Sequence, residues 1–219
     1  MHGGTRVLMA VAALGAVTTM AACSVTSDSK SKVSVAKIRQ AADKLIDDPK
    51  GPCPLGIDVT KALAKAGIGG TATPRADAET PAAEGESAKS AESPDSILQQ
   101  LNGALVTCDY TLSSGGHVST MLMGVGKGKA VNVLAPMISH DGQIGTEAFQ
   151  TFASQKFESG KAALTPNLGL VAVVELSAKD GDVALEVTSH NADDQSKNGP
   201  ITGEALRKFA EALAGQVSL

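Results

Sequence analysis

Aromatic side chains are scarce in this chain of 219 residues, which has no tryptophan and, in Tyr110, a single tyrosine. Sugars and bases are commonly bound by stacking on aromatic rings, and few rings are present here. Lysine and arginine form no dense basic cluster, and the formal net charge is −4, so we expect no nucleic acid among the partners. The core must be built from aliphatic residues and methionine.

Long apolar runs are missing as well. The most apolar stretch, residues 7–19, is too short to cross a membrane, because a spanning helix needs about 20 such residues. This stretch follows Arg6 and ends in small residues, which is the pattern of a secretory signal. Cys23 comes directly after that pattern. We therefore expect residues 1–22 to be a signal peptide that is removed on export.

A signal that ends at a cysteine predicts a lipid anchor. The sequence Met20-Ala21-Ala22-Cys23 resembles the lipobox of bacterial lipoproteins, in which the cysteine is diacylated and becomes the first residue. Two acyl chains hold a protein stably on a bilayer, since each buried methylene contributes about 0.8 kcal/mol. We expect lipid attachment at Cys23 and a location on the extracytoplasmic face of the cell membrane. The alternative is an ordinary signal cleaved after Ala22, with an incidental cysteine.

Cysteine is rare, and the two that remain beyond Cys23 are Cys53 and Cys108. Exported proteins fold in an oxidising setting, so this even pair predicts a disulfide. Oxidised cysteines are not nucleophiles, and the chain has no Gly-x-Ser-x-Gly motif. We expect no catalytic residues, no cofactor and no enzymatic activity.

The rest of the chain is predicted to form one domain. Residues 23–33 are polar and suit a flexible tether, and residues 34–219 carry the domain. Within it, residues 70–95 contain no Leu, Ile, Val or aromatic residue, which predicts a disordered insertion. Lengthening a flexible loop costs little free energy, so shortening this one should be tolerated.

Periodicity predicts an α+β fold with a four-stranded antiparallel sheet. Alternating residues pair 104–112 with 117–125 as one hairpin, and 168–177 with 182–189 as a second. Helical spacing predicts helices packed on this sheet. These helices cover residues 34–46, 59–67, 94–102, 131–138, 146–160 and the segment from 202 onward, with Pro136 expected to kink or shorten the fourth.

Besides the lipobox, three features are Pro52-Cys53-Pro54-Leu55, the short helix at 59–67 and Thr107-Cys108-Asp109-Tyr110. With these features the chain resembles actinobacterial cell-envelope lipoproteins of unknown function. The resemblance implies export, the anchor and the disulfide, and it implies no reaction.

One group of side chains invites a metal hypothesis. His117, Met121 and Met123 share one parity on a predicted strand, and His140 follows within reach of a folded sheet. Imidazole and thioether ligands suit Cu(I). The alternative is that the methionines fill gaps in a core that is short of aromatic rings.

The sequence thus favours a non-enzymatic lipoprotein that binds an unidentified envelope protein or small ligand. A copper-handling lipoprotein that uses the Met/His face is the alternative. A hydrolase with an unrecognised site is the third hypothesis.

Overall fold

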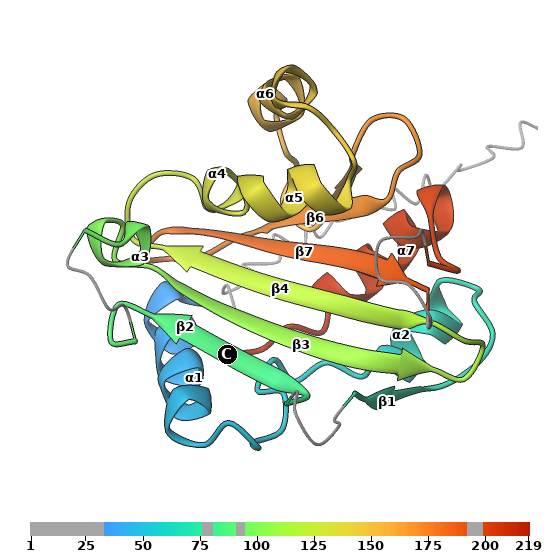
Figure 1. Ribbon diagram of the computed structural model, residues 1–219, viewed down its shortest axis with the longest axis horizontal. Helices are drawn as coiled ribbons and strands as arrows, with labels where there is room; N and C mark the ends of the chain where they lie inside the picture. The colour runs from blue at the N-terminus through green and yellow to red at the C-terminus, as the bar shows by residue number, and fades with distance from the viewer. Residues whose placement is uncertain (1–32, 76–80, 91–94, 192–198) are drawn as a thin grey trace, which may run out of the picture.

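A computed structural model of the protein describes residues 33–75, 81–90, 95–191 and 199–219 (Figure 1). Within these ranges the chain forms an open, antiparallel sheet of seven strands with helices on both faces. The α+β class is confirmed, whereas the prediction of four strands is wrong. The strands are β1 (Ala72–Pro74), β2 (Ala83–Ser87), β3 (Ala104–Leu112), β4 (His117–Val125), β5 (Ala162–Leu164), β6 (Val171–Leu176) and β7 (Asp182–His190). The helices are α1 (Val35–Asp47), α2 (Val59–Lys65), α3 (Ile97–Gln100), α4 (Ala130–Val133), α5 (Ala135–Asp141), α6 (Thr146–Ser154) and α7 (Gly203–Ala214).

The two predicted hairpins form the centre of the sheet. β3 pairs with β4, and β6 pairs with β7 through the turn that contains Asp180 and Gly181. β4 and β7 then pair along their whole length, with Leu122 opposite Leu185. The strand order is therefore β1-β3-β4-β7-β6-β5, with β2 also paired to β3.

Three strands at the two edges of the sheet were not predicted. β1 and β2 share the outer edge of β3, and β5 pairs with the outer edge of β6. The predicted disorder of residues 70–95 is therefore wrong for the described parts, 70–75 and 81–90. Shortening this stretch would remove two strands, β1 and β2, so the domain is not expected to tolerate it. Gly85 lies against α1 so closely that a Cβ there would be 2.7 Å from the Cα of Ala42.

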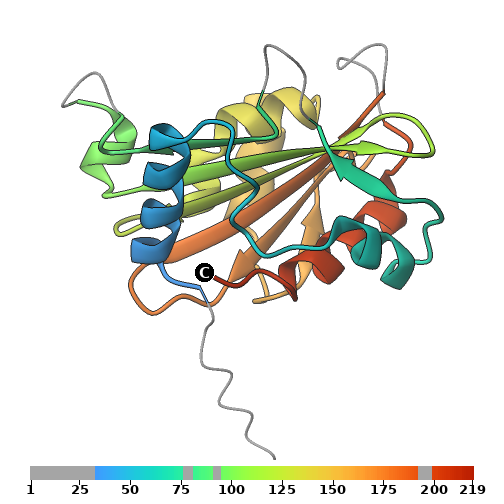
Figure 2. The same cartoon turned by 90° about the horizontal axis from the view of Figure 1, so that it is seen from below.

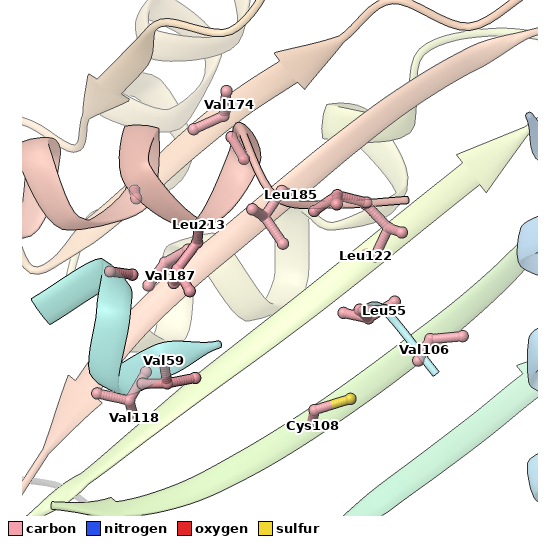
Figure 3. Close-up of a cluster of buried hydrophobic side chains, with 14 of the residues drawn as sticks. Leu55, Val59, Val106, Cys108, Val118, Leu122, Val174, Leu185, Val187 and Leu213 are labelled. Carbon is pink, nitrogen blue, oxygen red and sulfur yellow. The ribbon is translucent and has the colours of Figure 1, made fainter. Parts of the chain in front are cut away.

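One face of the sheet is covered by α1, α2 and α7 (Figure 2). Alternate residues of the central strands, such as Leu122 and Leu185, lie in this core together with Leu213 of α7 (Figure 3). The start of α1 is fixed by two caps: Ser34 accepts from the Lys37 amide, and the Asp180 carboxylate accepts from the Val35 amide at 2.8 Å. The second hairpin turn thereby holds the first helix.

The opposite face is covered by α4, α5 and α6 (Figures 1 and 2). Pro136 divides the helix predicted at 131–138 into α4 and α5, because proline has no amide hydrogen to donate. α6 ends at Ser154, earlier than predicted, and packs through Phe152. In Figure 1 α6 is the helix farthest from the sheet.

The predicted disulfide between Cys53 and Cys108 is present. Their Cα atoms are 5.8 Å apart, and the bond joins the segment between α1 and α2 to β3. Cys108 is fully buried in the core on the face that α1, α2 and α7 cover, beside Leu55 and Val106 (Figure 3).

Candidate functional site

The Met/His face lies on the side of the sheet that α4, α5 and α6 cover. Met123 is 1% exposed in that core, and Met121 is half-buried against the same cluster. His117 stands at the start of β4, with its Nδ1 3.4 Å from the Thr111 hydroxyl. His140 is on α5, where its exposed ring contacts Asp141 at 2.7 Å.

Within the described ranges, no three or more His, Cys, Asp or Glu side chains are grouped so that they could hold a metal ion. The burial of Met123 favours the core-filling alternative, because its thioether is enclosed by apolar side chains. The copper hypothesis stays a prediction.

Glu186 was not singled out from the sequence. It lies opposite Met121 on β7 and is completely buried, and neither carboxylate oxygen has a hydrogen-bond partner among the residues that the structure describes. Burial raises the pKa of the Glu186 carboxyl well above its usual value, and the nearby negative charge of Asp141 raises it further. Both effects favour the protonated, neutral form of this carboxyl in the folded protein.

A threonine, a histidine and an aspartate lie close to one another near the end of β7. The Thr188 hydroxyl is 2.9 Å from Nε2 of His190, and the same nitrogen is 4.0 Å from the Asp141 carboxylate. A catalytic triad needs the hydroxyl and the carboxylate on different ring nitrogens. Thr188 is also only 2% exposed, so a substrate carbonyl has no access to it. This arrangement gives no support to the hydrolase hypothesis.

The described surface contains another candidate site, which lies beside α6. A groove of about 580 Å³ separates one side of this helix from the end of β5 and the residues that follow it. Its walls are mainly apolar and come from Ala148, Phe152, Leu164 and Pro166. Small-molecule sites have volumes of about 300–1,000 Å³ and similar linings.

The helix beside this groove is held in place by aromatic packing. Phe152 and Phe157 meet edge to face, with ring centroids 5.5 Å apart. Their contact folds the chain after Ser154 back against α6, so one wall of the groove is fixed before a ligand arrives. The sequence predicted the apolar face of this helix. It did not indicate the opposite wall, which is formed by Leu164 at the end of β5 and by Pro166.

Polar groups at the groove are acidic or neutral. Glu147, Thr151 and Gln155 contribute to the lining, and no lysine or arginine of the described part of the chain does. The Thr151 hydroxyl donates to the Glu147 carbonyl within the helix. The Glu147 carboxylate forms no ion pair with the residues that the structure describes, so the groove carries one uncompensated negative charge. A ligand with a carboxylate or phosphate would be repelled there.

Comparison of the chain with protein-family models, with curated proteins and with solved structures found no match in any of the three. Among the described helices, none has the length and apolar character needed to cross a membrane. The predicted anchor, Cys23, and most of the predicted tether lie outside the described residues.

Proposed function

We propose that this chain is a non-enzymatic lipoprotein, anchored by Cys23 on the outer face of the cytoplasmic membrane, that binds a small apolar ligand in the α6 groove. The groove is the observation that carries the proposal, because its volume and apolar walls match those of small-molecule sites. Its single negative charge favours a neutral or cationic amphiphile. The lipobox and the resemblance to envelope lipoproteins support the location.

The anchor is tested by Cys23→Ser, which removes the sulfur that would carry the lipid. We expect the variant to leave the membrane fraction or to remain unprocessed, since no acyl chain can attach. Fractionation with intact-mass measurement reads both outcomes, and Ser24→Ala is the control that should behave like the wild type. A variant that is processed normally and retained on membranes would contradict the anchor.

The groove is tested with N-phenyl-1-naphthylamine, a neutral apolar fluorophore. Ala148→Phe places a ring in the groove, so we expect the affinity for this probe to fall at least about tenfold, as the filled site can no longer bury it. Ala205→Phe, on the exposed side of α7, adds the same ring elsewhere and should leave the affinity unchanged. Equal affinities for both variants would show that the groove is not the binding site.

The charge of the groove is tested with the sulfonated analogue 8-anilinonaphthalene-1-sulfonate. We expect it to bind more weakly than the neutral probe, because Glu147 repels the sulfonate. Glu147→Gln should raise the affinity for the sulfonate several-fold and leave that for the neutral probe the same. If Glu147→Gln preferred the neutral probe over the sulfonate as strongly as the wild type does, the charge of Glu147 would not be the cause of that preference.

A further inference from the structure

Three lysines from separate parts of the fold surround a second hollow, of about 310 Å³. Lys65 ends α2, Lys161 directly precedes β5, and Lys208 lies on α7. We call this hollow the lysine cleft, and Gly160, Glu211 and Ala212 complete its lining. The convergence is notable because the chain as a whole has a formal net charge of −4.

The acidic residue inside the lysine cleft is already engaged. The Glu211 carboxylate accepts from Arg207 at 2.8 Å and from the Ala162 amide at 3.4 Å. Arg207 is shared, because it also pairs with the Glu204 carboxylate at 2.6 Å. It therefore offsets the charge of Glu211 only in part, and the lining carries three lysines against this one carboxylate, which leaves the cleft positive. Among the described residues, Lys65 and Lys161 form no ion pair, and Lys208 lies 4.0 Å from Glu204.

The lysine cleft is lined by α2 and α7 on the face of the sheet that also carries α1, the first described helix. α2 and α7 cover the same face as α1, whose first turn follows Val33 (Figure 2). The Gly160 amide donates to the carbonyl of Glu175 at 2.8 Å, near the end of β6. Three residues further on, Ala178 pairs with Val33. One wall of the cleft therefore lies beside the point where the tether would join the domain.

We propose that the lysine cleft binds the phosphate headgroup of an anionic phospholipid in the membrane that carries the anchor. Cys23 precedes Val33 by ten residues, which span at most about 36 Å, so the domain is confined close to the bilayer surface. Each lysine near an anionic membrane surface contributes about 1 kcal/mol of attraction, that is, about a fivefold gain in binding. The confinement of the domain near the bilayer depends on the proposed anchor at Cys23. The positive charge of the cleft does not depend on it.

The test uses a chain that starts at Ser24, so that no lipid anchor contributes to binding. Every described helix and strand lies after Val33, so this chain retains the whole described fold. We expect it to sediment with vesicles of phosphatidylglycerol and phosphatidylcholine and not with phosphatidylcholine alone. Binding should weaken between 0.1 M and 1 M salt, because these exposed charges are screened.

The triple variant Lys65→Gln, Lys161→Gln, Lys208→Gln should lower the vesicle partition coefficient by about a hundredfold. A matched control with the same net charge replaces three exposed lysines elsewhere, Lys50→Gln, Lys127→Gln and Lys156→Gln, and should retain most of the binding. Equal losses in both triple variants would overturn the proposal, because binding would then reflect net charge alone. Titration with inorganic pyrophosphate completes the test: lysine-dependent binding of pyrophosphate without vesicle binding would overturn the assignment to a lipid. The chain that starts at Ser24 lacks Cys23, so the vesicle and pyrophosphate results do not depend on the anchor.

Discussion

Replacing both disulfide cysteines, as Cys53→Ala and Cys108→Ala, is expected to lower the free energy of unfolding by about 4 kcal/mol. The bond closes a loop with a sequence separation of 55 residues, and the loss of unfolded-chain entropy for a loop of that size gives this magnitude. For a domain of this size the melting temperature should fall by about 10 °C. The measurement is chemical denaturation of the oxidised wild type and of the double variant, followed by circular dichroism.

Reduction of the wild type supplies the control. With thiols shown to be free by titration, the reduced wild type should unfold near the midpoint of the double variant, whose own midpoint should not respond to reductant. Burial of Cys108 adds a small packing loss to the variant that reduction does not produce. If the fully reduced and oxidised wild types had the same midpoint, the disulfide would not contribute to stability.

The centre of the sheet could be predicted from sequence because its signals are local. The Asp180-Gly181 turn lies between two alternating apolar runs, and those runs fix which residues face the core. The disulfide followed from the number of cysteines and the predicted compartment alone.

The edges of the sheet could not be predicted, because an edge strand needs little from its side chains. β2 is held by main-chain pairing with β3, from Ala83 opposite Cys108 to Ser87 opposite Ala104. Its residues have low strand propensity, and Gly85 is required only because α1 passes so close. Composition therefore indicated disorder where tertiary contacts impose a strand.

The candidate binding regions were missed for a similar reason. The α6 groove needs Leu164 and Pro166 from the far side of a loop, and the lysine cleft joins Lys65 to Lys208 across most of the chain. The lining residues of these two sites lie too far apart in the sequence to form a recognisable motif. Both depend on how α6 and α7 lie on the two faces of the sheet.

Raising the pH should destabilise this protein through Glu186, and Glu186→Gln should remove that effect. An unfolded glutamate loses its proton near pH 4.3, whereas the buried carboxyl keeps its proton to a higher pH. Between those two pKa values the folded state binds more protons, so each pH unit lowers the free energy of unfolding by about 1.4 kcal/mol. Below both values the contribution of Glu186 is fully present. The measurement is urea denaturation across a pH series starting at pH 4.

The result is read as a difference between variants. Glu186→Gln retains every other side chain, including Asp141 on α5, so the contributions that the two proteins share largely cancel in the comparison. Glu84→Gln, on the exposed side of β2, makes the same substitution at a solvent-exposed position and should leave the pH dependence through Glu186 intact. Glu186→Met should go further and stabilise the domain by about 1–3 kcal/mol, because it replaces unpaired buried oxygens with an apolar chain of similar length. Parallel profiles for the wild type and Glu186→Gln would mean that the carboxyl reaches water or a partner, and the assignment of a buried neutral acid would then be wrong.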